Sequence, residues 1–108
     1  MMNKISVILF LLLNFTGYSQ ETYTISGIVS EDASGETLIG VNIIFPDIQR
    51  GTITNEYGFH SITLPKGTYN IEVSYIGYET IRKQISLTSN LKENFKLKFQ
   101  SETIDEVV

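Results

Sequence analysis

From Thr22 onward, apolar and polar side chains alternate along the chain with a period of two rather than the 3.6-residue period of a helix. In the first such stretch, Ile25, Gly27 and Val29 alternate with Thr24 and Ser26. Successive side chains of a strand point to opposite faces of its sheet, so this spacing gives each strand one dry and one wet face. The chain is therefore constrained to fold as half-buried β-strands that pack their apolar faces together.

Turn-forming residues divide the alternation into short segments. Asn55-Glu56-Tyr57-Gly58 and Pro65-Lys66-Gly67 supply the asparagine, glycine and proline that tight turns require. The predicted strands span residues 23–29, 41–45, 51–54, 59–64, 68–76, 81–87 and 91–99. Seven short strands without a convincing helix predict an all-β fold, a seven-stranded β-sandwich.

The first 20 residues have the features of a cleavable export signal. Lys4 provides the positive start, residues 5–15 form an eleven-residue apolar run, and Gly17 and Ser19 are small residues suited to cleavage after Ser19. Cleavage after Gln20 is the other option. The apolar run is shorter than the roughly 20 residues that cross a bilayer. We therefore expect a signal peptide over residues 1–20, in preference to a retained anchor or a buried helix, and no membrane span in the mature part.

The net charge indicates which kinds of partner the protein can bind, and the cysteine content indicates the compartment in which it works. Without Lys4, seven basic residues face twelve acidic ones, so the mature part carries a formal charge of −5, which argues against nucleic acid. Lys92, Lys96 and Lys98 alternate with apolar residues and are predicted to be the wet face of the last strand. The chain has no cysteine, which excludes a bacterial lipid anchor and is typical of a bacterial envelope protein. A periplasm or an outer surface is the expected compartment.

Residues that could carry chemistry are sparse, so no catalytic residue, cofactor or metal is expected. His60 is the single histidine and is predicted to point outward from its strand, without the partners that a zinc site or a serine nucleophile needs. A calcium site built from turn carboxylates is a weaker alternative to plain turn solubility; those carboxylates are Asp32, Glu36, Asp47 and Glu56. Tyr69, Tyr75 and Tyr78 could form a sugar-stacking platform, but the parity of Tyr69 and Tyr75 favours core packing.

Several segments together resemble the carboxypeptidase regulatory-like domain. They are Ile25-Ser-Gly-Ile-Val, Leu38-Ile-Gly-Val-Asn-Ile, Gly51-Thr-Ile-Thr-Asn-Glu-Tyr-Gly-Phe and Tyr69-Asn-Ile-Glu-Val-Ser-Tyr-Ile-Gly-Tyr. The positions that carry the family's motif are Gly27, Gly40, Gly51, Thr54, Asn55, Gly58, Phe59, Pro65, Gly67, Ser74, Tyr75, Gly77 and Tyr78. The family usually has aspartate where this chain has Asn55, and either side chain can cap the turn. The resemblance implies a transthyretin-like (prealbumin-like) Greek-key sandwich over residues 21–100, without peptidase activity.

The resemblance also implies a role at the outer membrane. In Gram-negative bacteria this domain commonly precedes the plug of TonB-dependent receptors, and residues 101–108 resemble the linker to such a plug through Ile104, Asp105, Glu106, Val107 and Val108. The first hypothesis is thus a non-catalytic accessory domain of a nutrient receptor, truncated or separately encoded, on the periplasmic face of the outer membrane. Its partners would be envelope proteins such as a plug and barrel. The second hypothesis is a free-standing periplasmic or surface module that binds carbohydrate or protein through exposed aromatic residues such as Tyr57 and Tyr78.

Overall fold

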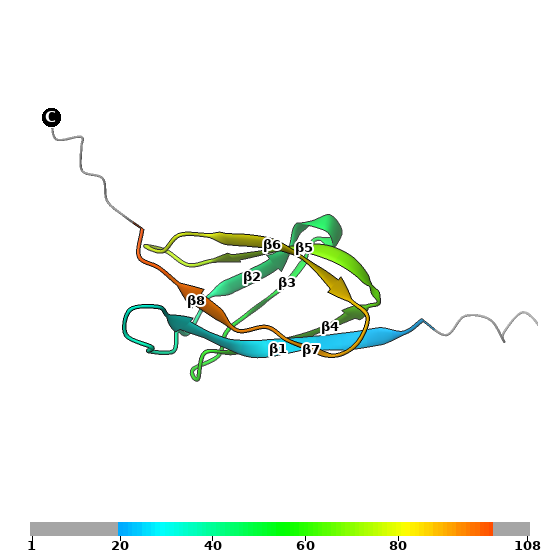
Figure 1. Ribbon diagram of the computed structural model, residues 1–108, viewed down its shortest axis with the longest axis horizontal. Helices are drawn as coiled ribbons and strands as arrows, with labels where there is room; N and C mark the ends of the chain where they lie inside the picture. Colours follow the sequence, from blue (N-terminus) through cyan, green and yellow to red (C-terminus); the bar gives the residue numbers. More distant parts are fainter. Residues whose placement is uncertain (1–19, 101–108) are drawn as a thin grey trace, which may run out of the picture.

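The computed structural model describes residues 20–100 of the 108-residue chain (Figure 1). The predicted signal peptide before Gln20 and the predicted plug linker at 101–108 lie outside the described residues. The elements are β1 (Thr22–Glu31), β2 (Asn42–Phe45), the 3-10 turn η1 (Pro46–Ile48), β3 (Arg50–Ile53), β4 (Phe59–Pro65), β5 (Gly67–Ser74), β6 (Ile81–Leu87), β7 (Leu91–Lys92) and β8 (Phe95–Leu97).

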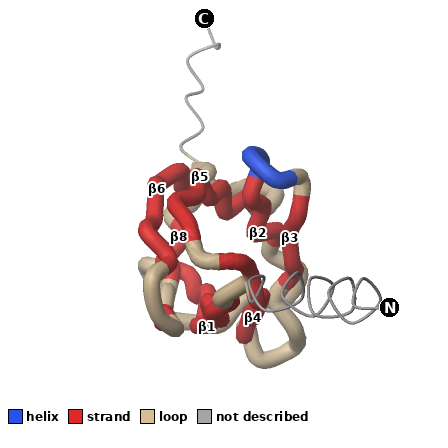
Figure 2. The backbone as a smooth tube through the Cα atoms, turned by 90° about the vertical axis from the view of Figure 1, so that its right-hand side faces the viewer, coloured by secondary structure: helices blue, strands red, loops and turns tan. Residues whose placement is uncertain are grey.

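The strands form two facing sheets (Figures 1 and 2). In the first sheet β1 lies between β4, which is antiparallel to it, and β7 and β8, which are parallel to it. The second sheet has the order β3-β2-β5-β6, with every neighbouring pair antiparallel. The chain passes from one sheet to the other after β1, β3, β4 and β6, which is the Greek-key arrangement. The predicted all-β sandwich is confirmed.

Alternating side chains of both sheets fill the space between them, as the period of two predicts. The buried apolar residues are Ile25, Val29, Leu38, Val41, Ile43, Phe45, Ile62, Leu64, Tyr69, Ile71, Val73, Ile85, Leu87, Phe95 and Leu97. The Phe45 and Tyr69 rings meet edge to face with their centroids 6.1 Å apart. Each fully buried side chain of this size contributes about 1.5–3 kcal/mol of transfer free energy, so the core stabilises the sandwich without disulfides.

The last predicted strand, 91–99, is interrupted in the structure. It becomes β7 and β8 because the backbone of Glu93 turns toward β1 and approaches Gly27, where an added Cβ would lie 2.0 Å from the Glu93 carbonyl oxygen. The Asn94 side chain replaces the missing ladder bond, since its Oδ1 accepts from the Ile28 N–H at 2.8 Å. Phe99, which shares the apolar parity of this strand, is 60% exposed because the chain has left β1 beyond Leu97.

The two ends of the sandwich carry different loops. Residue 20 lies at one end and residue 100 at the other (Figure 1). We call the second end the exit end and define it by the loops 32–41, 54–58 and 75–80 together with residues 98–100. The opposite end carries residues 20–21, the η1 turn and the loops at 66 and 88–90.

Candidate interaction surface at the exit end

A buried threonine ties two loops of the exit end together. Thr54 is 3% exposed, and its Oγ1 accepts from the Val41 N–H at 2.9 Å and donates to the Leu38 carbonyl at 2.7 Å. Thr54 also uses its own backbone, because its N–H donates to the Val41 carbonyl and its carbonyl accepts from the Gly40 N–H. One short side chain thereby satisfies the polar groups of a loop that crosses between the sheets.

The neighbouring Asn55 caps the turn between β3 and β4. Its Oδ1 accepts from the N–H groups of Tyr57 at 2.9 Å and Phe59 at 3.1 Å. The amide oxygen makes both bonds, so asparagine performs the capping that an aspartate carboxylate would perform. Gly58 completes the turn with a φ of +76°, and a Cβ there would lie 2.8 Å from the Val29 carbonyl oxygen, so only glycine fits.

Three aromatic rings stack across the exit end. The Tyr75 and Tyr78 centroids are 5.6 Å apart, and the Tyr78 and Phe99 rings stack at 4.6 Å. The Tyr78 hydroxyl donates to Glu31 Oε2 at 3.0 Å, and the other carboxylate oxygen of Glu31 accepts from Ser34 Oγ. Partial burial, with the bond to the Glu31 carboxylate, raises the pKa of Tyr78 above its ordinary value of 10.0.

This stack fixes the chain where it leaves the sandwich. Tyr78 and Phe99 form an antiparallel bridge. The Glu79 N–H donates to the Lys98 carbonyl at 2.8 Å, and the Gln100 N–H donates to the Gly77 carbonyl at 2.9 Å. Residues 98–100 are therefore held against the 75–80 loop up to the last described position.

The third tyrosine of the predicted platform lies elsewhere. Tyr69 is 7% exposed, packs on Phe45 and donates its hydroxyl to the Pro65 carbonyl near the opposite end. Tyr75 is partly buried against the core, as its parity predicts. The structure therefore does not bring the three tyrosines together, and Phe99 takes the third place in the stack.

The remaining motif positions serve the backbone. Gly40 and Gly77 lie in the exit-end loops with positive φ, Gly51 lies on β3 against the Ile43 carbonyl, and Ser74 ends β5. Pro65 and Gly67 form the β4–β5 turn at the opposite end. Most of the motif thus gathers at the exit end, while Gly27, Gly51, Pro65 and Gly67 lie away from it.

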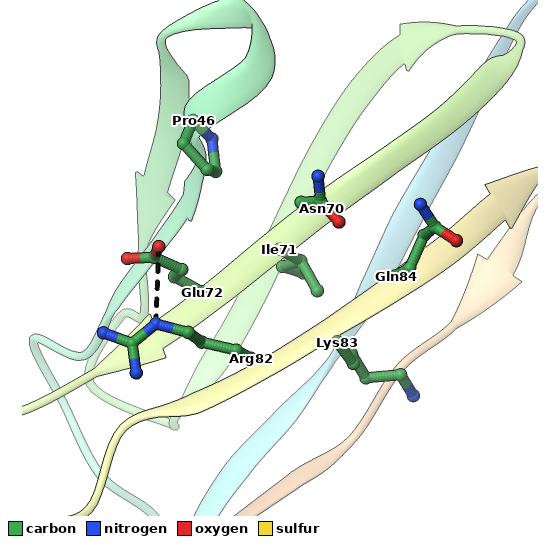
Figure 3. Close-up of a pocket in the computed structure, with 7 residues that line it drawn as sticks. All are labelled: Pro46, Asn70, Ile71, Glu72, Arg82, Lys83 and Gln84. Carbon is green, nitrogen blue, oxygen red and sulfur yellow. Dashed lines mark ion pairs between the residues drawn. The ribbon is translucent and has the colours of Figure 1, made fainter.

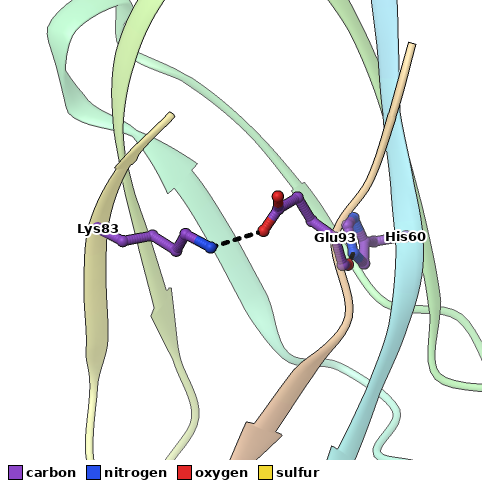
Figure 4. A network of polar contacts seen from close by, with 3 residues as sticks. All are labelled: His60, Lys83 and Glu93. Atoms are coloured by element: carbon purple, nitrogen blue, oxygen red, sulfur yellow. Dashed lines mark hydrogen bonds and ion pairs between the residues drawn. The ribbon is translucent and has the colours of Figure 1, made fainter. Parts of the chain in front are cut away.

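His60 is buried, and the prediction that it points outward is wrong. It is 1% exposed because it shares the inward parity of Ile62 and Leu64, while Phe59 takes the outward position. Its ring lies 5.7 Å from Phe95, and its Nε2 is 2.7 Å from the Glu93 carbonyl (Figure 4). A carbonyl only accepts, so Nε2 carries the proton. Nδ1 has no hydrogen-bond partner, and burial lowers the pKa of His60 below 6.5.

Glu93 links His60 to the other sheet. Its carboxylate pairs with Lys83 Nζ on β6 at 2.9 Å, and its backbone N–H donates to the Ser26 carbonyl (Figure 4). The open side between β6 and β7 is thus bridged by one residue. One ring nitrogen of His60 is bound to the Glu93 carbonyl and the other has no hydrogen-bond partner, and no metal-binding group forms around the ring within residues 20–100.

A shallow hollow of about 370 Å³ lies on the outer face of β5 and β6 (Figure 3). Its lining is Pro46, Asn70, Ile71, Glu72, Arg82, Lys83 and Gln84. Glu72 and Arg82 pair at 3.6 Å across it, and Asp47 holds Asn70 through its backbone and side-chain amides. These contacts occupy Glu72, Arg82 and Asn70, and none of the seven residues offers an aromatic face to a sugar.

Within residues 20–100, no three of the histidine and acidic side chains come together as a metal-binding group. Asp47 lies at the opposite end from Asp32, Glu36 and Glu56, so the four turn carboxylates do not converge. Over those residues, no helix has the length and apolar character needed to span a bilayer.

The sequence profile of the CarboxypepD_reg-like domain matches residues 25–108. The chain belongs to this family. The CarboxypepD_reg-like domain is 36% identical over 99 residues to TonB-dependent receptor P39 of Formosa agariphila, covering 92% of this chain and 9% of that receptor. It is 33% identical over 98 residues to TonB-dependent receptor SusC of Bacteroides thetaiotaomicron, covering 91% and 9%. The chain therefore spans about a tenth of the length of each of these relatives.

Solved structures share the fold at low identity. The CarboxypepD_reg-like domain superposes on 3-chlorocatechol 1,2-dioxygenase from Rhodococcus opacus with a TM-score of 0.59 at 13% identity, covering 79% of this chain and 62% of that one. At that identity the likeness concerns the sandwich alone. The dioxygenase's activity therefore says nothing about the activity of this domain.

Sequence reasoning missed the residues that complete the exit end and the sheet closure. Glu31 and Ser34 hold Tyr78, Phe99 completes the stack, and Glu93 joins His60 to Lys83. The parity of His60 with Ile62 and Leu64 was available as a signal for its burial. The partners of Tyr78 and His60 lie 20 to 50 positions away in the sequence, so no local pattern indicates them.

Proposed function

We propose that this CarboxypepD_reg-like domain is a non-catalytic N-terminal accessory domain of a TonB-dependent outer-membrane nutrient receptor. Residues 1–20 would export it, and it would lie on the periplasmic face of the outer membrane. The observation that carries the proposal is the 36% identity to receptor P39 over 92% of this chain. The 33% identity to SusC over 91% of this chain also supports it.

The exit-end geometry supports this role. Backbone bonds hold residues 98–100 to the 75–80 loop, so the segment that follows leaves the sandwich from a fixed position. That segment is the predicted plug linker at 101–108, in which the acidic pair Asp105 and Glu106 lies between Ile104 and the two residues Val107 and Val108. A domain of this kind would present a partner surface at a defined distance from the plug, without chemistry of its own.

The test is the size and location of the native product. An antibody raised against residues 21–100 should detect, in the outer-membrane fraction, a polypeptide roughly ten times longer than this chain. The gene should continue past codon 108 into a plug and a barrel. The proposal would be overturned if the product were no larger than the 12.2 kDa chain and were recovered from the periplasm, and if the gene ended in a stop codon followed by an unrelated gene.

A second function, a free-standing carbohydrate- or protein-binding module, is favoured by one observation. Tyr57 is 69% exposed at the tip of the 54–58 loop, as a stacking residue for a sugar would be. Tyr78 is unsuited to this role because its ring is stacked and its hydroxyl is bound to Glu31. Glycan-array binding that disappears in Tyr57→Ala would support this module, and an array without signal would remove it.

A further inference from the structure

Exposed apolar side chains are concentrated at the exit end. Within residues 20–100, eight large apolar residues are substantially exposed, and six of them lie in the exit-end loops or in the strand ends beside them. The six are Ile39 (55% exposed), Ile53 (60%), Tyr57 (69%), Phe59 (41%), Ile76 (90%) and Phe99 (60%). Single exposed apolar residues are common on any protein, but their concentration at one end marks an interaction surface.

The loops that carry these residues are joined in one row. Phe99 stacks on Tyr78, Tyr78 contacts Tyr75, and a Cβ on Gly40 would lie 3.9 Å from the Tyr75 ring. The Gly40 N–H donates to the Thr54 carbonyl, and Thr54 begins the β3–β4 turn that carries Tyr57. In Figure 1 these loops lie at the end of the sandwich where the described chain leaves it, with the 75–80 loop above the 32–41 loop and the 54–58 loop below it. The loops are anchored by buried bonds, so their apolar tips are displayed in a fixed arrangement.

The charged side chains in the exit-end segments are mostly acidic. Asp32, Glu36, Glu56 and Glu79 are exposed in the exit-end loops, and Lys98 is the single basic residue in the segments that define that end. The opposite end is balanced, since Glu21 and Asp47 accompany Arg50 and Lys66. An apolar centre with an acidic rim complements a partner whose apolar residues are surrounded by lysine and arginine. The same rim disfavours a second copy of this end, because like charges would meet.

We infer that the exit end is a docking surface for a protein partner that presents apolar side chains flanked by basic ones. The inference takes from the proposed function only the assumption that the partner is a protein. Ile76, Ile39 and Tyr57 would be buried at the centre of the contact, and the four carboxylates would set its rate and salt dependence. Ile76 carries the largest exposed fraction of these side chains and makes no contact that the sandwich needs.

The probe is a short synthetic peptide of alternating lysine and leucine, with a peptide of alternating glutamate and leucine as its charge-reversed control. Amide shifts of the exported chain are followed by NMR during titration. The lysine peptide should shift the loops of the exit end alone, and raising the salt from about 0.05 M to about 0.5 M should weaken binding. Ile76→Ser and Tyr57→Ser should each weaken it about fivefold or more. Ile48→Ser, at the opposite end and 37% exposed in the wild type, should leave it unchanged.

Several outcomes would overturn the inference. Equal binding of the glutamate peptide would remove the charge argument, and shifts spread over both outer faces would indicate unspecific adhesion. Dimerisation that Ile76→Ser abolishes would replace the basic partner by a second copy. These results are independent of the receptor proposal, because a receptor-length product with no peptide binding leaves that proposal standing. If the native product is 12.2 kDa or less and binds the peptide, the docking surface is supported and the receptor proposal is refuted.

Discussion

Replacing Thr54 by valine should destabilise the domain strongly although the two side chains have nearly the same shape. The substitution removes the hydroxyl that accepts from the Val41 N–H and donates to the Leu38 carbonyl. Val41 is fully buried and Leu38 is 9% exposed, so water cannot readily replace the lost partner. Each buried polar group left without a partner costs about 1–3 kcal/mol.

Two groups lose their partner and about 0.8 kcal/mol is recovered from the buried methyl group of valine, so the expected loss is about 1–5 kcal/mol. A domain of this size has a free energy of unfolding of about 4–12 kcal/mol, so the loss is a large fraction of the total. Thr54→Ser is the matched control because it keeps the hydroxyl and removes only a methyl group. It should cost about 1 kcal/mol.

Urea unfolding followed by tyrosine fluorescence measures the effect. With a slope of about 1 kcal/mol per molar urea, the midpoint of Thr54→Val should fall by about 1 M or more. Native-state hydrogen exchange should show the Gly40 amide, which donates to the Thr54 carbonyl, exchanging faster. If valine proves as stable as serine at this position, the hydroxyl does not hold the loop and the reasoning fails.

Three further predictions concern His60, Gly27 and Tyr78. Burial lowers the pKa of His60, so the unfolded state takes up a proton near pH 6.5 while the folded state does not. The free energy of unfolding should therefore fall as the pH is lowered from 6.5 to the pKa of the folded state. His60→Gln should flatten this part of the profile of urea midpoint against pH, and an unchanged slope would contradict the prediction. Gly27→Ala should cost about 1–3 kcal/mol or more in urea unfolding, because its Cβ would lie 2.0 Å from the Glu93 carbonyl oxygen, and a neutral result would refute that contact. Tyr78 has a raised pKa, so folding stability should decline as the pH rises above 10, and absorbance titration should show one phenol fewer ionising in that range after Tyr78→Phe. Titration of Tyr78 at its ordinary pKa of 10.0 would contradict the effect of the bond to Glu31.

The sequence predicted the parts of the fold that depend on neighbouring residues. Alternation identified the inward faces of β1, β2 and β5. Asn55 and Gly58 predicted their turn because asparagine caps and glycine accepts a positive φ. Such features are decided within a few residues, so a single sequence is enough to read them.

The errors arose where distant segments meet. Residues 91–99 look like one continuous strand, but Gly27 allows the Glu93 backbone to approach, and the strand breaks there. The inward position of His60 depends on the same approach, because the Glu93 carbonyl gives its ring a hydrogen-bond acceptor in the core. Phe99 alternates as a core residue would, yet its partner is Tyr78 in another loop.

The docking surface and the fixed exit of the chain share one loop. Ile76 is 90% exposed, while the carbonyl of its neighbour Gly77 accepts from the Gln100 N–H and the Glu79 N–H donates to the Lys98 carbonyl. A partner that covers Ile76 therefore contacts the segment that sets where the chain leaves the sandwich. Tyr78 ties this segment to Glu31 at the end of β1, so a displacement of the loop is opposed by the first sheet. Binding at the exit end and the position of residue 100 therefore depend on each other through the 75–80 loop. A partner bound to the outer face of β5 and β6 would not contact this loop and would leave the position of residue 100 unchanged.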